Sequence, residues 1–170
     1  MDSVIQKKIC MLGDFAVGKT SLVHRFVEGR FDDRYLSTIG VKVSRRIVTL
    51  AERTTVHLLV WDLAGSEEFT GVQASYLQGA AGALLVCDLT RSTTLDSLSR
   101  YAQRLREVRP QANLILVGNK NDLTAERAIE DDDLAALASE LRATWFTTSA
   151  KSGENVEAAF TSLAKCTLAG

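Results

Sequence analysis

The residues GDFAVGKT, at 13–20, have the types and spacing of a loop that holds phosphate groups. They fit the pattern G-x-x-x-x-G-K-[ST] and lie between a strand-like run and a helix-like stretch, the context that this pattern requires. The glycines let the backbone wrap around phosphates, Lys19 places a cation against the β and γ oxygens, and Thr20 offers a hydroxyl to Mg²⁺. A glycine-rich turn without a ligand and an ATPase loop are alternatives that these eight residues alone leave open.

Two further motifs follow apolar runs, NKND at 119–122 and SAK at 149–151. The carboxylate of Asp122 can accept hydrogen bonds from the ring N–H and the exocyclic amine of guanine, a donor pair that adenine lacks. Discrimination of this kind can reach the order of 10⁴-fold. Lys120 has a stem that can lie along a base, Asn119 is placed to tie this loop to the phosphate loop, and a backbone N–H of SAK could donate to guanine O6. Either motif alone is an ordinary turn.

A third pair of motifs, YLSTIG at 35–40 and WDLAG at 61–65, supplies groups for a metal and a γ-phosphate. Asp62 ends a buried strand, where its carboxylate can hold Mg²⁺ through water, and Thr38 offers a second hydroxyl. The N–H of Gly65 can reach a γ-phosphate. Because the loops follow strands in one order along the chain, we expect them to meet at the carboxyl edge of a sheet.

Short apolar runs alternate with helix-period stretches along the whole chain. The pattern predicts strands at 7–13, 41–50, 54–62, 82–88, 112–119 and 144–149. It predicts helices at 19–29, 67–78, 94–108, 130–142 and 155–166. This alternation implies parallel strands with right-handed crossovers, and the tight link after 41–50 predicts an antiparallel hairpin at one edge. We therefore expect an α/β fold, a single domain over 1–170 with a six-stranded mixed, mostly parallel sheet and about five helices on both faces.

Composition narrows the class of protein. The chain has 170 residues, of which 46% are apolar and 24% charged, as in an ordinary globular domain. The net charge of −1 predicts no broad attraction to nucleic acid or anionic lipid, so we expect no nucleic-acid partner. No apolar run approaches the ~20 residues of a membrane span, and the start lacks the pattern of a signal peptide.

The three cysteines favour a reducing, cytoplasmic setting. Cys10 and Cys87 lie inside apolar runs, where we expect buried thiols. Cys166 is fifth from the end, whereas a prenylation box needs its cysteine fourth from the end, so no membrane anchor is visible in this chain. Peripheral membrane association would require a lipidated tail that had been removed.

Taken together, the motifs resemble those of Ras-superfamily small GTPases, and the Rab-like branch in particular. The resemblance rests on GDFAVGKT, FDDRYLSTIGV, WDLAGSEEF, YLQGAAGALLVCDLT, NKND and SAK, which cover nearly the whole chain. It implies a P-loop G domain that binds GTP and GDP with Mg²⁺ and hydrolyses GTP. It also implies that Phe31 packs edge-on against the base, that Tyr35 folds over the phosphates, and that segments 31–40 and 64–76 respond to the γ-phosphate.

The motifs and the resemblance give a full set of expected site residues. Nucleotide contacts are expected from Gly13, Phe15, Ala16, Val17, Gly18, Lys19, Thr20, Ser21, Phe31, Tyr35, Thr38, Gly65, Asn119, Lys120, Asp122, Ser149, Ala150 and Lys151. The expected Mg²⁺ ligands are Thr20, Thr38 and Asp62, and hydrolysis is expected to involve Lys19, Thr38, Gly65 and Ser66. The two isolated histidines, His24 and His57, predict no metal site.

The sequence departs from the resembled family around the γ-phosphate. Members usually carry glutamine after the glycine of D-x-x-G, and its amide orients the attacking water. Here that residue is Ser66, which is two heavy atoms shorter, and Leu63 replaces the usual threonine. Phe15 and Ala16 stand where glycine or serine is usual, and a phenyl ring at Phe15 would crowd the γ-phosphate and obstruct an arginine finger. We therefore expect slow intrinsic hydrolysis with GTP binding intact, unless another group or a partner replaces the glutamine.

Three functions remain open. In the leading one, the chain is a switch whose GTP and GDP states present different surfaces at 31–46 and 64–76 to an effector, an exchange factor and a GTPase-activating protein. In the second, a hydrolysis-deficient interaction module keeps GTP as a structural cofactor. The third, an adenine-nucleotide enzyme such as a kinase, is disfavoured by NKND and SAK. We expect the chain to be a monomer.

Overall fold

The computed structural model describes residues 3–31, 41–63 and 74–169. Its sheet consists of β1 (Ser3–Leu12), β2 (Val41–Thr49), β3 (Thr54–Leu63), β4 (Gly82–Asp88), β5 (Asn113–Asn119) and β6 (Thr144–Thr147). The strand order is β2-β3-β1-β4-β5-β6. The β2–β3 pair is antiparallel and the other pairs are parallel. The expected mixed sheet with a hairpin at one edge is confirmed.

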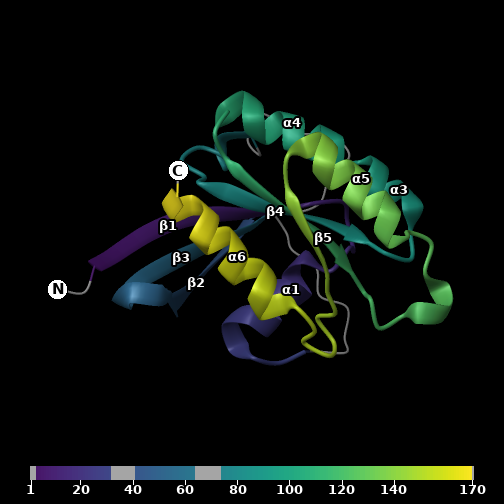
Figure 1. The fold of residues 1–170 in the computed structure, drawn as a ribbon, viewed down its shortest axis with the longest axis horizontal. Helices are drawn as coiled ribbons and strands as arrows, with labels where there is room; N and C mark the ends of the chain where they lie inside the picture. The colour runs from purple at the N-terminus through teal and green to yellow at the C-terminus, as the bar shows by residue number, and fades with distance from the viewer. Residues whose placement is uncertain (1–2, 32–40, 64–73, 170) are drawn as a thin grey trace.

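The described ranges contain α1 (Lys19–Glu28), α3 (Ser92–Asp96), α4 (Leu98–Val108), α5 (Asp131–Leu141) and α6 (Val156–Ala169). Short 3-10 turns occur at Ala51–Arg53 and Thr124–Glu126. Helices α1 and α6 cover one face of the sheet, and α3, α4 and α5 cover the other (Figure 1). The helix expected at 67–78 lies mostly outside the described ranges, which show helix only at 74–75. In the part of the chain that the structure describes, no helix is both long and apolar enough to cross a membrane.

Two apolar layers hold the helices to the sheet. Every residue of β4 is buried, as expected for a parallel strand covered on both faces. On the side of α1 and α6, the rings of Phe26 and Phe160 stack with their centroids 4.0 Å apart. On the other side, Cys10 and Cys87 lie in the layer beneath α3, α4 and α5, and both are fully buried. The prediction of buried thiols at these positions is confirmed.

The stretch 94–108, expected as one helix, is divided into α3 and α4 at Ser97. The Oγ of Ser97 lies 3.1 Å from the carbonyl oxygen of Thr93, a contact of the kind that bends helices. The same hydroxyl donates to Oδ2 of Asp14 at 2.7 Å, and the hydroxyl of Tyr101 reaches Oδ1 of Asp14 at 3.2 Å. The break therefore brings the start of α4 onto the loop that follows β1.

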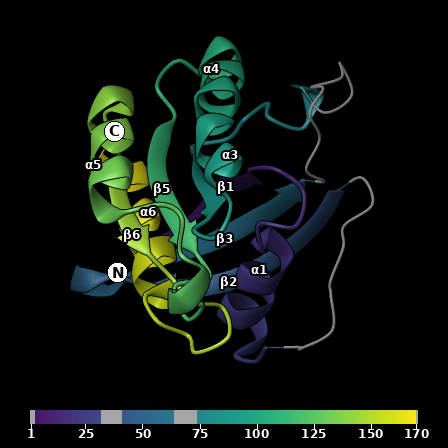
Figure 2. The ribbon, with the colours of Figure 1, turned by 90° about the vertical axis from the view of Figure 1, so that its right-hand side faces the viewer.

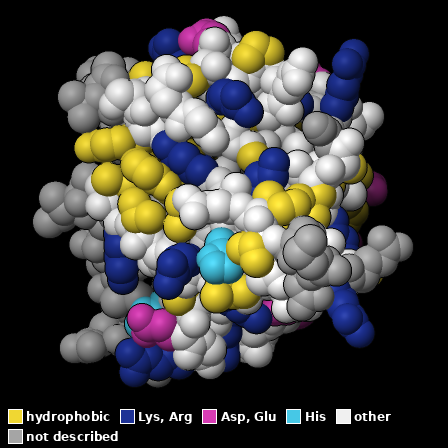
Figure 3. All heavy atoms as spheres, turned by 90° about the vertical axis from the view of Figure 1, so that its left-hand side faces the viewer, with side chains coloured by type: hydrophobic (Ala, Val, Ile, Leu, Met, Phe, Trp, Pro, Cys, Tyr) yellow, Lys and Arg dark blue, Asp and Glu magenta, His cyan; other side chains and the backbone are white. Residues whose placement is uncertain are grey.

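The edge strand β2 has an inner and an outer side. Arg46 points inward, where its guanidinium lies over the ring of Phe26 and pairs with Glu157 of α6. Val43 and Ile47 point outward and are 48% and 51% exposed. Figure 3 views the molecule from the left of Figure 1 and shows apolar side chains interspersed with lysine and arginine on that side.

The register of the sheet brings chemically active residues to one edge. Asp62 at the end of β3 pairs with Met11 near the end of β1, and Asp88 at the end of β4 pairs with Asn119 at the end of β5. The loops that follow β1, β4, β5 and β6 therefore begin side by side. Figure 2 views the molecule from the side on which these loops lie.

Candidate nucleotide-binding site

The loop between β1 and α1 has a backbone that requires glycine at two positions. Gly13 has a φ of +151°, and a Cβ there would lie 2.2 Å from the carbonyl oxygen of Val86 on β4. Gly18 has a φ of +100°, and a Cβ there would lie 2.3 Å from Nδ2 of Asn119. These two residues therefore let the loop pack directly against β4 and the end of β5.

Lys19 is held inside this loop. The residue is 6% exposed, and its Nζ donates to the carbonyl oxygens of Gly13 at 2.9 Å and Asp14 at 3.0 Å. Burial lowers the pKa of Lys19 to about 8, although the charges of Asp62 and Asp14 oppose that shift. A desolvated ammonium in this position attracts an anion more strongly than one in water would.

Asp88 holds two cations beside the loop, and sequence reasoning missed it. Its side chain is 2% exposed, and Oδ2 lies 2.9 Å from Nζ of Lys120 and 3.0 Å from Nε of Arg91. Burial would raise the pKa of Asp88, but hydrogen bonds from Thr90, Lys120 and Arg91 outweigh burial and lower it. The carboxylate therefore stays ionised and fixes both cations.

These cations also bind the backbone of the phosphate loop. Nζ of Lys120 donates to the carbonyl oxygen of Ala16 at 3.0 Å, and Nη2 of Arg91 donates to that of Phe15 at 2.9 Å. Ala16 has a φ of +64°, a left-handed conformation that few residues other than glycine adopt. The side chain of Phe15 is 59% exposed. Both unusual residues of the loop are thus anchored through their carbonyl groups, and the phenyl ring projects into solvent.

Asn119 joins three loops through one buried side chain. Its Nδ2 donates to the carbonyl oxygen of Val17 at 3.0 Å, and its Oδ1 accepts from the hydroxyl of Thr148 at 3.0 Å. Asn119 is 2% exposed and Thr148 is fully buried. The loops after β1, β5 and β6 consequently have fixed positions relative to one another. Thr148 was not among the expected site residues.

Asp122 and Ser149 meet at the side of the site where a base is expected. The buried hydroxyl of Ser149 donates to Oδ1 of Asp122 at 2.7 Å. Asp122 itself is exposed. Its carboxylate is therefore oriented by the protein and still open to a ligand.

The loop after β6 is also held from α1. Arg25 donates from Nε to the carbonyl oxygen of Ala150 at 2.8 Å and from Nη2 to that of Lys151. Ala150 is buried and Lys151 is exposed. Arg25 is a further contributor that the motifs do not contain.

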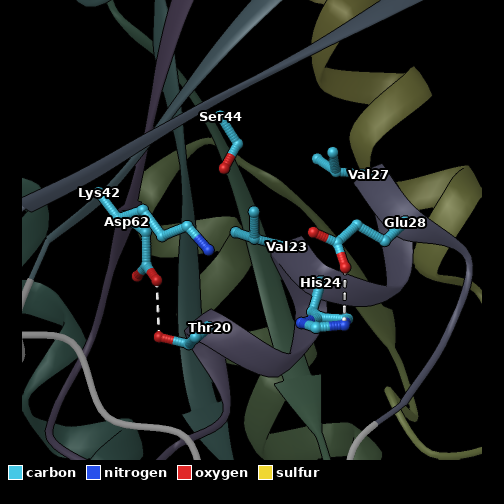
Figure 4. Close-up of a pocket in the computed structure, with 8 residues that line it drawn as sticks. All are labelled: Thr20, Val23, His24, Val27, Glu28, Lys42, Ser44 and Asp62. Atoms are coloured by element: carbon cyan, nitrogen blue, oxygen red, sulfur yellow. Dashed lines mark hydrogen bonds and ion pairs between the residues drawn. The ribbon is translucent and has the colours of Figure 1, made fainter.

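Thr20 and Asp62 form a pair of oxygen ligands at one end of a pocket between α1 and the β2–β3 hairpin (Figure 4). Oγ1 of Thr20 donates to Oδ2 of Asp62 at 2.6 Å. The pocket is further lined by Val23, His24, Val27, Glu28, Lys42 and Ser44. A hydroxyl and a carboxylate are the hard oxygen ligands that Mg²⁺ prefers, so this donor pair fits the ion. His24 points toward Glu28 instead, with Nε2 3.0 Å from its carboxylate.

The structure brings together the expected residues of the phosphate loop, of NKND and of SAK, and it places Asp62 beside Thr20. Ser21 lies half-buried in the first turn of α1, and Phe31 is half-buried against the core layer beneath that helix. The other expected residues, Tyr35, Thr38, Gly65 and Ser66, lie outside the described ranges.

One missed residue had a detectable signal. Asp88 is a polar residue that ends β4 after the apolar run GALLVC, much as Asp62 follows LLVW in β3 and Asn119 follows LILVG in β5. No signal in the sequence marks Arg25, Arg91 or Thr148, because each acts through contacts between segments far apart in the sequence.

Comparison with known proteins agrees with this geometry. The family model described as "Ras: Ras family" matches residues 8–169. GTP-binding protein ypt5 of Schizosaccharomyces pombe is 41% identical over 163 residues, which are 95% of this chain and 77% of that protein. Ras-related protein Rab-13 of Rattus norvegicus is 38% identical over 93% of this chain and 78% of its own length. Ras-related protein Rab-4B of Homo sapiens is 40% identical over 95% and 76%. The chain therefore belongs to the Ras family of small GTPases, close to the Rab branch.

Proposed function

We propose that this protein is one G domain that alternates between a GTP-bound and a GDP-bound state, and that it reads guanine with Asp122 and the loop 149–151. The observation that carries this function is the joining of the base and phosphate loops by Asn119, with Asp122 oriented by Ser149 on the same edge. A carboxylate held there accepts from the N1–H and the 2-amino group of guanine, while adenine would leave it without donors.

The nucleotide that remains bound after purification tests this assignment. Denatured protein analysed by chromatography is expected to release GDP or GTP, and unlabelled ATP in excess is expected not to displace labelled GTP. Folded protein with Mg²⁺ that shows no preference for guanosine over adenosine phosphates would overturn the assignment.

For the phosphate end we propose that Lys19 and the N–H groups of the loop 13–20 bind the β- and γ-phosphates. Thr20, Asp62 and Thr38 would hold Mg²⁺, and the contact between Thr20 and Asp62 supports the first two. Bound there, Mg²⁺ supplies positive charge to the β- and γ-phosphate oxygens. Lys19 adds an ammonium that is already desolvated, and the N–H of Gly65 would orient the γ-phosphate.

We further propose that hydrolysis is slow, because Ser66 is too short to orient water as glutamine does. Phe15 would add to this effect, because its side chain is 59% exposed and a ring at this position of the loop would obstruct an arginine finger. A single-turnover assay with purified protein and Mg²⁺ measures the rate. Brisk hydrolysis would contradict the proposal, and a complete lack of turnover would make GTP a permanent structural cofactor instead.

The proposed partners bind the segments 31–46 and 64–76, as effector, exchange factor and activating protein. The described part of these segments includes Val43 on the outer side of β2, next to Trp61 on β3. We propose a monomer in a reducing, cytoplasmic setting, in keeping with three free cysteines. Size-exclusion chromatography in the GTP and GDP states tests the oligomeric state.

A further inference from the structure

The loop after β6 keeps two backbone N–H groups available. The N–H groups of Ser149, Ser152 and Gly153 donate to acceptors inside the loop. Those of Ala150 and Lys151 have no hydrogen-bond partner among the described residues. They are therefore the donors that this loop can offer to an acceptor on a base.

The carbonyl groups next to these donors are bound by Arg25. Its Nε donates to Ala150 O and its Nη2 to Lys151 O, which fixes two consecutive peptide groups. Because the peptides are trans and planar, the N–H of Lys151 points away from the guanidinium that holds the carbonyl group of Ala150. The position of Arg25 thus decides the direction of this N–H.

The contacts of Arg25 within the described ranges are all to carbonyl oxygens. None of the described carboxylates pairs with it, and its third contact, from Nη1 to Gly29 O, is long at 3.5 Å. Charged donors make stronger hydrogen bonds to carbonyl groups than neutral donors do. A half-buried guanidinium that binds two adjacent carbonyls of one loop is a fixed support for that loop.

We propose that Arg25 is a positioning residue for guanine recognition, which aims the N–H of Lys151 at the 6-oxo group of the base. This rests on the proposed function, and it adds to Asp122 a second specificity contact that is controlled from α1. Arg25 does not touch the base. It acts through the peptide between Ala150 and Lys151.

Dissociation rates of three nucleotides from Arg25→Met and wild-type protein test this role. GDP and inosine diphosphate both carry the 6-oxo group, whereas 2-aminopurine riboside diphosphate lacks it. We expect Arg25→Met to release GDP and inosine diphosphate about tenfold faster, the effect of about one hydrogen bond. Release of the 2-aminopurine nucleotide should change less than about twofold.

Arg106→Met is the matched control, because Arg106 also donates to a backbone carbonyl, that of Leu141, at a site remote from SAK. It should leave all three rates unchanged. If Arg25→Met does not fold, Arg25→Lys replaces it, since lysine keeps a cation near the carbonyl groups but lacks the planar fork of donors that fixes their direction, and should give a smaller acceleration with the same selectivity.

Equal acceleration of all three nucleotides, or of none, would overturn the role of Arg25. A wild-type protein that binds the 2-aminopurine nucleotide as tightly as GDP would instead overturn the proposed guanine recognition. The two failures are therefore distinguishable in one set of measurements.

Discussion

The base end and the phosphate end of the proposed site are built differently. At the base end, Asn119, Asp122 and Ser149 are fixed by side-chain hydrogen bonds that join separate loops. At the phosphate end, the groups that would meet the γ-phosphate include Phe15 and Ser66, where the chain departs from its family. Under the proposed function, nucleotide identity and nucleotide turnover would depend on different residues, so we expect that each can be changed while the other is kept.

The largest expected effect lies at the base end. Asp122→Asn replaces two acceptor oxygens with one acceptor oxygen and one NH2 donor. One of the two donors of guanine would then face a donor instead of an acceptor. Preference for GTP over xanthosine triphosphate should fall by on the order of 10⁴-fold. Competition binding with both nucleotides measures the ratio. No gain toward the xanthine nucleotide would show that Asp122 does not read the base.

The next effect concerns turnover alone. Ser66→Gln restores an amide that can orient water, and single-turnover hydrolysis should rise by up to on the order of 10²-fold. GTP affinity should stay the same, because the base end is untouched. The double variant Phe15→Gly with Ser66→Gln separates the two residues. If only the double variant is faster, the ring of Phe15 is the dominant obstacle.

Asp88 connects the two ends, since it holds Lys120 on one side and Arg91 on the other. Asp88→Asn should lower the free energy of unfolding at neutral pH by about 2 kcal/mol, because two cations lose their anion. The pKa of Asp88 is lowered in the folded protein, so its contribution is present above the ordinary pKa of an aspartate and is lost as pH falls through the folded value. Urea denaturation at neutral and acidic pH measures the free energy of unfolding of variant and wild type. The difference between the two should become smaller as the pH is lowered. A difference that grows with acid would contradict this account.

The smallest expected effect concerns the hydrogen bonds by which Asn119 connects the loops after β1, β5 and β6. Thr148→Val removes a buried hydroxyl that donates to Oδ1 of Asn119 and should cost about 1 kcal/mol of unfolding free energy, with several-fold faster GDP release. Thr167→Val is the control, because that hydroxyl bonds to Ala164 of its own helix. Equal effects on GDP release would mean that Asn119 needs no support from Thr148.

Much of the fold could be predicted from sequence because apolar periodicity sets it. The strand 82–88 has the same bounds in the prediction and in the structure. The edge hairpin was predicted from the short link after 41–50. The helix expected at 130–142 is found as α5, where Glu130 at the N-cap and Asp133 form a capping box. The break at Ser97 was not predicted, and the hydroxyl at this break donates to Asp14, a residue remote in the sequence that periodicity does not connect to it.

The same distinction holds in the site. Residues within a motif, such as Lys19 and Asp122, could be named because GDFAVGKT and NKND have recognisable residue types at fixed spacing. Arg25 and Arg91 could not, since each binds main-chain carbonyls and carbonyls carry no sequence signal. Sequence therefore indicates which groups contact a ligand, and the folded structure is needed to find those that hold them in place.

The three thiols differ in a way that matters for attaching a reporter. Burial raises the pKa of both Cys10 and Cys87 to about 12, so neither offers a thiolate to a maleimide dye at neutral pH. Cys166 is half-buried near the end of α6, at the opposite end of the strands from the phosphate loop. Among these three thiols, Cys166 is therefore the labelling position, and fluorescence attached there can follow partner binding without an introduced cysteine.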